Sequence, residues 1–146
     1  MLNLGHEARV TRVMNAVAAG NNDVQSSTVI DMAGFEAAAF VASLGAIAAG
    51  GAATVTVWQG NQPNMADGAP LVNAQVAYTD ADDDLVAIID VGKPMGRYLQ
   101  ARIARAAGGD TTIDGVLALQ YRARNAPVVQ GATVLGTVVL VSPNTI

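Results

Sequence analysis

The chain contains no cysteine and a single histidine, His6. Without cysteine there can be no disulfides, no cysteine-ligated zinc sites and no thiol nucleophiles, which fits a reducing compartment. One histidine offers no second imidazole for a metal pair, and its place near the N-terminus is unsuited to the base of a Ser–His–Asp triad. We therefore expect a protein that is not an enzyme and that holds no metal and no cofactor.

Positive charge is also scarce. Lysine occurs once, at Lys93, and the formal net charge is −4. Binding to phosphates requires clustered lysine and arginine, so no nucleic-acid partner is expected. The longest apolar stretch, residues 37–49, is shorter than the about 20 residues that span a bilayer, and the N-terminus lacks a signal-peptide pattern. No membrane partner is expected.

Apolar residues, by contrast, are abundant. They make up 51% of the chain, and the mean hydropathy of +0.34 is high for a soluble monomer. Two explanations are open. Part of the apolar surface contacts other subunits, or the core is simply rich in alanine and valine.

The apolar residues form short alternating runs separated by turn residues. Residues 54–58 alternate β-branched side chains before Gly60 and Asn61, which is typical of a strand that ends in a turn. About eight or nine such segments recur at intervals of roughly 8–15 residues. The pattern predicts one mainly β domain over residues 1–146, an antiparallel β-sandwich or barrel that is jelly-roll-like with little helix. Residues 1–6 are expected to form a short flexible arm.

Two segments, 36–49 and 97–106, have patterns that a helix and a strand could both produce. The turn residues at 108–110 favour a strand for the second segment, in a hairpin that pairs 97–105 with 113–124. Further strands are expected at residues 24–32 and 134–141.

The most concentrated charge lies in residues 80–84, whose aspartates are Asp80, Asp82, Asp83 and Asp84. Their spacing begins like a calcium-binding EF-hand loop. However, Leu85 stands where that loop requires glycine, and Val91 stands where it requires a bidentate carboxylate. A solvated turn is therefore favoured over an ion site.

Arginines gather in the C-terminal part of the chain, at Arg97, Arg102, Arg105, Arg122 and Arg124. If the hairpin forms, several of them share one face. That face could contact acidic groups of a neighbouring subunit through fork-like arginine–carboxylate pairs. Alternatively, the charges keep an edge pair of strands soluble.

Three segments carry a resemblance. They are DMAGFEA at residues 31–37, TDADDD leading into VAIIDV at 79–91, and RYL at 97–99 followed by DTTIDGVLALQY at 110–121. In this order, they resemble a family of small proteins encoded in the structural gene clusters of tailed bacteriophages, near the major capsid protein. The resemblance covers about residues 1–143, and the ordered set carries it rather than any single motif.

The resemblance implies a head decoration (cement) protein, made in the host bacterial cytoplasm and located on the capsid exterior of the virion. Such a protein clamps adjacent capsomers and stabilises the expanded shell. The implied partners are the major capsid protein and further copies of the chain, as a homotrimer or homodimer. The residues expected to make these contacts belong to the arm and the arginine face: Leu2, Asn3, Leu4, Arg97, Arg102, Arg122 and Arg124.

Two alternative functions are kept. A tail-tube or head–tail connector subunit would use a long hairpin such as 97–124 in ring stacking. A carbohydrate- or receptor-binding module would need an exposed aromatic platform, and aromatic residues are only 4% of the chain. Its candidates are Trp58, Tyr78, Tyr98 and Tyr121, although Trp58 and Phe40 are expected in the core.

Overall fold

The computed structural model of the protein describes residues 3–139. Within this range the chain forms one short helix and ten strands. Their bounds are α1 (Leu4–Glu7), β1 (Arg9–Met14), β2 (Val17–Gly20), β3 (Asp23–Ser26), β4 (Ile30–Asp31), β5 (Phe35–Ile47), β6 (Ala52–Gly60), β7 (Ala69–Thr79), β8 (Val86–Gly92), β9 (Tyr98–Arg105) and β10 (Thr111–Ala123).

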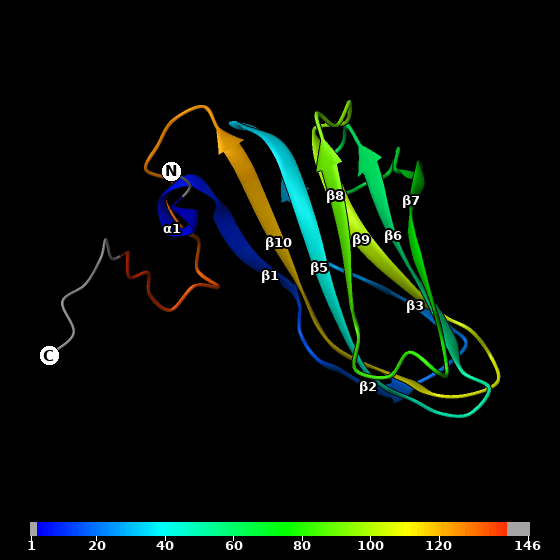
Figure 1. The fold of residues 1–146 in the computed structure, drawn as a ribbon. Coiled ribbons are helices and arrows are strands. Elements are labelled where there is room, and N and C mark those ends of the chain that lie inside the picture. Colours follow the sequence, from blue (N-terminus) through cyan, green and yellow to red (C-terminus); the bar gives the residue numbers. More distant parts are fainter. Residues whose placement is uncertain (1–2, 140–146) are drawn as a thin grey trace, which may run out of the picture.

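The strands build two antiparallel sheets that face each other (Figure 1). In the first, here called sheet A, the order is β1-β10-β5-β8, and β2 also pairs with β10. In the second, sheet B, the order is β3-β9-β6-β7, and β4 also pairs with β9. The protein is therefore a β-sandwich with almost no helix, as predicted.

Two edges of the sandwich are interrupted strands, because β1 and β2 both lie along β10 while β3 and β4 both lie along β9. Counting each of these couples as one strand reduces the ten strands to eight. In chain order, sheet A then holds the first, eighth, third and sixth strands, and sheet B the second, seventh, fourth and fifth. This is the strand order of a jelly roll, which confirms the predicted architecture.

The core lies between the sheets and follows from strict alternation along the long strands. Phe40 and Leu44 of β5 point inward, and Leu99 and Ile103 of β9 meet them from the opposite sheet, all with 0% of their surface exposed. Successive side chains of a strand point to opposite faces, so β6 and β9 and most of β5 bury every second residue. Both ambiguous segments, 36–49 and 97–106, are strands, because a sheet partner lies on each side of β5 and β9.

The predicted hairpin of 97–105 with 113–124 is wrong. β9 pairs with β6, β3 and β4 in sheet B, whereas β10 pairs with β5, β1 and β2 in sheet A. The connection at 106–110 crosses between the sheets: the amide of Ala106 donates to the carbonyl of Ala52, and that of Ala48 to the carbonyl of Asp110, both at 2.8 Å. A strand buries the same inner face whether the strand after the turn pairs with it in one sheet or crosses to the opposite sheet. The alternating pattern therefore does not distinguish a hairpin from a crossover between sheets.

Two smaller expectations also change. Residues 24–32 form two short strands, β3 and β4, rather than one. The segment expected as a last strand at 134–141 has no strand over 134–139, and its remainder lies outside the described residues.

The C-terminal segment instead runs beside the free edge of β1. Side chains of this segment accept hydrogen bonds from β1 amides: Gln130 Oε1 from Val10 at 2.9 Å and Thr133 Oγ1 from Arg12 at 3.1 Å. This edge of sheet A is therefore capped by side chains in place of a backbone ladder.

A buried arginine connects the two sheets at one end of the sandwich. Arg105, at the end of β9, has a side chain only 4% exposed and forms a bidentate ion pair with Asp23 of β3. Its Nη1 also donates to the carbonyl of Ala18 at 2.8 Å and to that of Thr111, the first residue of β10, at 2.9 Å. One guanidinium thus donates hydrogen bonds to oxygen atoms of both sheets. Because it is buried, Arg105 is not part of any exposed arginine surface.

We predict that Arg105→Ala lowers the free energy of unfolding by about 3 kcal/mol, because removing one partner of a buried pair leaves the others unsatisfied. Arg102→Ala is the matched control, since Arg102 lies three residues earlier on β9 and faces away from the core, and it should cost under about 1 kcal/mol. Urea unfolding followed by circular dichroism measures both. Equal losses for the two variants would contradict this role of Arg105.

A second prediction concerns Thr111, whose buried Oγ1 has no hydrogen-bond partner among the described residues. Burying an unpaired hydroxyl costs free energy, and valine has nearly the same shape without it. Thr111→Val should therefore raise the free energy of unfolding by about 1 kcal/mol in the same assay. A loss of stability would show that the hydroxyl is satisfied in solution.

Candidate interaction surfaces

The outer face of sheet A carries apolar side chains on four adjacent strands, with the polar side chains of Arg12, Ser43 and Asp90 among them. The antiparallel register places Leu117 of β10 beside Val41 of β5, and Val41 beside Ile88 of β8. One row further along, Leu119 lies beside Ala39. None of these side chains belongs to the core between the sheets. The residues of this surface, called here the outer face of sheet A, are Val10, Ala39, Val41, Val86, Ile88, Leu117 and Leu119.

Several of these side chains are open to solvent, with Leu117 41%, Val86 54% and Ile88 64% exposed. The solvent-facing side of an antiparallel sheet ordinarily carries polar residues. A contiguous apolar patch on a soluble protein marks an interaction site. Both explanations of the apolar composition have a place in the structure, because the core is rich in alanine and valine and the outer face of sheet A carries exposed apolar side chains.

The outer face of sheet B is mostly polar, although Val24 of β3 is 60% exposed there. The register places Thr56 of β6 between Arg102 of β9 and Gln75 of β7. Arg102 donates to Gln100 at 3.0 Å, and its guanidinium lies 3.9 Å from the ring centroid of Trp58. Trp58 is thus half-buried on the outer face, in phase with Thr56, and its expected place in the core is wrong. The two faces of the sandwich differ in chemistry.

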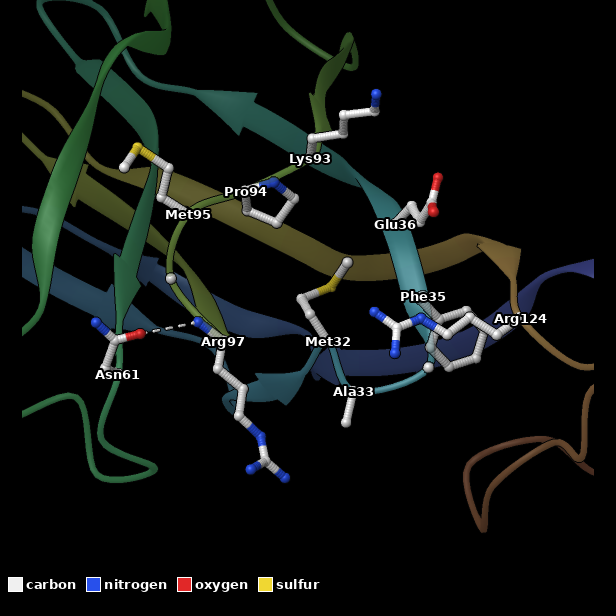
Figure 2. Close-up of a pocket in the computed structure, with 12 residues that line it drawn as sticks. Met32, Ala33, Phe35, Glu36, Asn61, Lys93, Pro94, Met95, Arg97 and Arg124 are labelled. Carbon is white, nitrogen blue, oxygen red and sulfur yellow. Dashed lines mark hydrogen bonds between the residues drawn. The ribbon is translucent and has the colours of Figure 1, made fainter.

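A pocket opens at the end of the sandwich where β10 finishes and β5 begins (Figure 2). Met32 and Phe35 contribute apolar surface. Three cations line the pocket, Lys93 and Arg97 from the β8–β9 connection and Arg124 from the end of β10, together with the carboxylate of Glu36. The backbone holds them there, since the amide of Lys93 donates to the Glu36 carbonyl at 2.7 Å and that of Arg124 to the Gly34 carbonyl at 2.9 Å.

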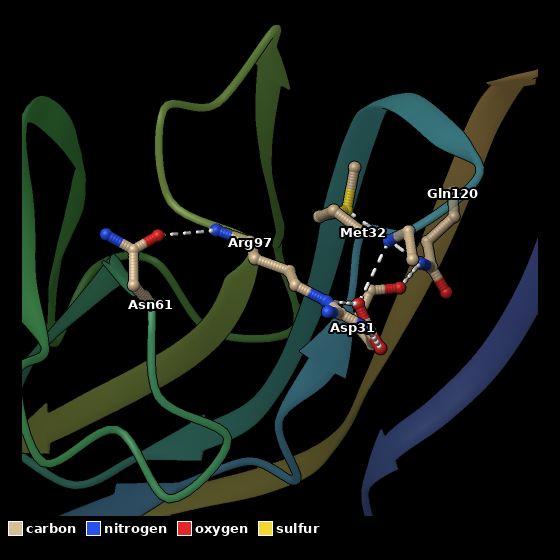
Figure 3. Close-up of polar contacts among 6 residues, drawn as sticks. Asp31, Met32, Asn61, Arg97 and Gln120 are labelled. Atoms are coloured by element: carbon tan, nitrogen blue, oxygen red, sulfur yellow. Dashed lines mark hydrogen bonds and ion pairs between the residues drawn. The ribbon is translucent and has the colours of Figure 1, made fainter.

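A polar network beneath this pocket joins the two sheets (Figure 3). Arg97 forms a bidentate pair with Asp31 of β4, with both N–O distances at 2.9 Å. The backbone amide of Arg97 donates to Asn61 at 3.3 Å. From sheet A, the buried side chain of Gln120 donates to the Asp31 carbonyl at 2.7 Å. Arg97 is therefore fixed by the scaffold, and Lys93 and Arg124 are the cations of the pocket without a recorded ion pair among the described residues.

The structure does not bring the predicted arginines onto one face, because the hairpin that would have joined them does not form. Arg97 and Arg124 line the end pocket. Arg102 lies on the outer face of sheet B, beside Trp58. Arg122, near the end of β10, lies over Tyr121 with 5.8 Å to the ring centroid. The surface that sequence reasoning missed is the outer face of sheet A, because Leu117 and Leu119 alternate in β10 with the equally apolar Val116 and Ala118.

The expected arm is only partly described. Leu2 lies outside the described residues. Asn3 precedes helix α1, and its carbonyl accepts hydrogen bonds from the amides of His6 and Glu7, both at 2.9 Å. The His6 carbonyl accepts from Val128 at 2.7 Å. Residues 3–6 are thus held against the C-terminal segment rather than extended from the body, and Leu4 remains 49% exposed.

The acidic segment 80–84 forms turns that support the end of sheet A. Asp83 accepts a hydrogen bond from the amide of Ile47 at 2.9 Å, and Asp80 accepts one from Gly50 at 2.8 Å. Asp82 accepts from the backbone and the hydroxyl of Thr79. Within residues 3–139, no group of three or more acidic or histidine side chains is arranged to hold a metal ion. His6 is exposed on α1.

In the described part of the chain, no helix has the length and apolar character needed to cross a membrane. Comparison of the sequence with protein-family models and with curated proteins gave no match.

The ion pairs at the two ends of the sandwich make stability depend on pH. Hydrogen bonds from Arg97 lower the pKa of Asp31, and hydrogen bonds from Arg105 lower the pKa of Asp23. A carboxyl with a lowered folded-state pKa contributes stability that is present above its unfolded pKa of about 3.9 and is lost as pH falls through the lower folded value.

We therefore predict that the free energy of unfolding falls as the pH is lowered from about 5 to 2. The double variant Asp23→Asn/Asp31→Asn should be less stable at pH 7 and should show a shallower decline. Urea unfolding at a series of pH values measures this. Parallel profiles for the two proteins would mean that other carboxyls control the acid transition.

Proposed function

We propose that this protein is a virion structural protein of a tailed bacteriophage that binds the outside of the capsid and stabilises the expanded shell by clamping adjacent capsomers. The observation that carries the proposal is the contrast between the two outer faces of the sandwich. An apolar sheet face opposite a polar one is suited to a protein that lies flat on another protein surface and leaves its far side in water. The resemblance of three ordered segments to small proteins encoded near the major capsid protein of tailed phages suggests that protein as the partner.

The size of the apolar face is consistent with this role. Four strands at about 4.8 Å spacing and six residues at about 3.3 Å rise give a surface of roughly 20 by 20 Å, or about 400 Å². Standard protein interfaces bury about 800 Å² on each partner. One copy therefore contributes a modest contact, and firm attachment requires further contacts or several linked copies on the shell.

Such attachment would stabilise the shell by mass action. A protein that binds the expanded shell but not its precursor lowers the free energy of the expanded state, by more as its concentration exceeds the dissociation constant. No catalytic step is needed for this work, and the rigid jelly roll presents its contact surface without reordering.

The alternative functions gain no support from the fold. The hairpin over 97–124 that suited ring stacking of a tail-tube or connector subunit does not form. The Trp58 ring, the best candidate for a carbohydrate platform, has the Arg102 guanidinium over it at 3.9 Å.

We expect the protein to be recovered with phage heads in an amount comparable to the major shell protein. We also expect Leu117→Lys to weaken rebinding of the protein to heads from which it has been stripped. Placing a charge where a leucine is buried forfeits about 2 kcal/mol, or roughly 30-fold in affinity. Mass spectrometry of separated heads and tails gives the location, and a sedimentation assay with purified heads gives the affinity.

Thr56→Lys, which places the same charge on the outer face of sheet B, is the control and should bind like the unaltered protein. Circular dichroism checks that both variants fold. Recovery of the protein with tails or at the neck in low copy number would refute the decoration role. Equal binding by Leu117→Lys and the unaltered protein would refute the assignment of the face.

A further inference from the structure

The sandwich has four edges, and three of them are blunted. The β1 edge is capped by Gln130 and Thr133 of the C-terminal segment. The edge of sheet B formed by β3 and β4 consists of two pieces of four and two residues. These are the devices by which native proteins prevent unwanted strand pairing.

The β7 edge is interrupted in its middle. Its register against β6 shifts between Thr56 and Trp58, Asn73 adopts a φ of 63°, and Pro70 lacks an amide proton. A bulge with a proline bends a strand away from any partner and removes a donor.

The β8 edge carries none of these devices within its seven residues, Val86–Gly92. It pairs in unbroken register with β5, from Val86 against Ser43 to Gly92 against Ala37. Beyond its ends, the amide of Lys93 bonds to Glu36 and the carbonyl of Leu85 to Leu44. Among the described residues, β5 is the only strand that β8 pairs with.

The ladder determines which backbone groups of β8 are unpaired. In an antiparallel ladder every second residue exchanges hydrogen bonds with its partner. Since residues 85 and 93 bond to β5, the odd-numbered residues between them do so as well. The N–H and C=O groups of Val86, Ile88, Asp90 and Gly92 therefore point to the free edge. The side chains of Val86 and Ile88 are 54% and 64% exposed.

Charges at the two ends of β8 identify its partner. The exposed carboxylates of Asp83 and Asp84 precede the strand, and the exposed ammonium of Lys93 follows it. If a second copy of β8 is aligned antiparallel about Ile88, Ile88 meets its equivalent and Val86 lies opposite Asp90 of the partner. No like charges face each other within the paired strands in this register, and the end of β8 that precedes Lys93 lies nearest the acidic turn 80–84 of the partner. Opposite charges across a strand pair stabilise it, and like charges destabilise it.

We propose that two copies of this chain associate by antiparallel pairing of β8 with β8 about a two-fold axis, making sheet A continuous across a homodimer. The contact is isologous, since each copy contributes the same strand. The capped β1 edge prevents further addition, so the assembly closes at two copies. This dimer doubles the area of the apolar outer face of sheet A, but it follows from the free strand edge and does not depend on capsid binding.

Sedimentation equilibrium over a range of protein concentrations tests the dimer. The unaltered protein should be a dimer, and Ile88→Pro should be a monomer, because proline removes an amide that faces the partner and leaves the bonds to β5 intact. Leu117→Lys is the control and should remain dimeric, since Leu117 lies on the same outer face two strands from the edge. Circular dichroism confirms that each variant folds.

A charge exchange tests the register separately. Lys93→Asp should weaken dimerisation at least tenfold, because it replaces an ammonium by a carboxylate beside the acidic turn 80–84 of the partner. Adding Asp84→Lys to that variant should restore most of the loss. Both positions are exposed but have positive φ values, 60° at Asp84 and 50° at Lys93, so circular dichroism checks that each variant folds.

Three results would overturn the proposal. The first is a protein that stays monomeric at a concentration of roughly 1 mM, where even weak specific association would be seen. The second is a trimer or an open polymer. The third is a dimer that survives Ile88→Pro or that dissociates on Leu117→Lys. The last result would transfer the self-contact to the outer face of sheet A. Loss of shell binding by a variant that remains dimeric concerns the capsid proposal alone.

Discussion

Each long strand of this protein must turn one row of side chains toward the space between the sheets, and this constraint determines the rest of the structure. The inner rows, with Phe40 and Leu44 facing Leu99 and Ile103, account for the core. The side chains of the outer rows do not contribute to the core and can therefore be polar or apolar. In sheet B they are polar, with Thr56 and Arg102 side by side, whereas in sheet A they remain apolar. The proposed contact surface is thus the outer face of strands whose inner face forms the core.

Two polar links hold the apolar layers in register. At one end, Arg105 joins the start of β10 to β3, and at the other, Gln120 and Arg97 converge on Asp31. The buried Arg105 link should cost about 3 kcal/mol when broken. The Arg97–Asp31 pair, with side chains 57% and 43% exposed, contributes less. The buried Gln120 bond adds a satisfied link between the sheets.

The fold class was predictable because turn residues separate short alternating runs, as in residues 54–58. The pairing of strands was not, since an alternating pattern is the same for a hairpin and for a strand that crosses to the other sheet, as β9 and β10 do. The placement of Trp58 was available from its phase with Thr54 and Thr56, both outward. The outer face of sheet A was harder to recognise. In β10 both rows are apolar, Val116 and Ala118 inward and Leu117 and Leu119 outward, so hydropathy does not tell which row is the core.

An electron cryo-microscopy reconstruction of the virion tests the account most directly, because it shows which face of the sandwich meets the shell. The account predicts jelly-roll density on the outside of the head with sheet A against the major capsid protein and Trp58 on the far side. Density with sheet B against the shell, or heads without this protein, would contradict it.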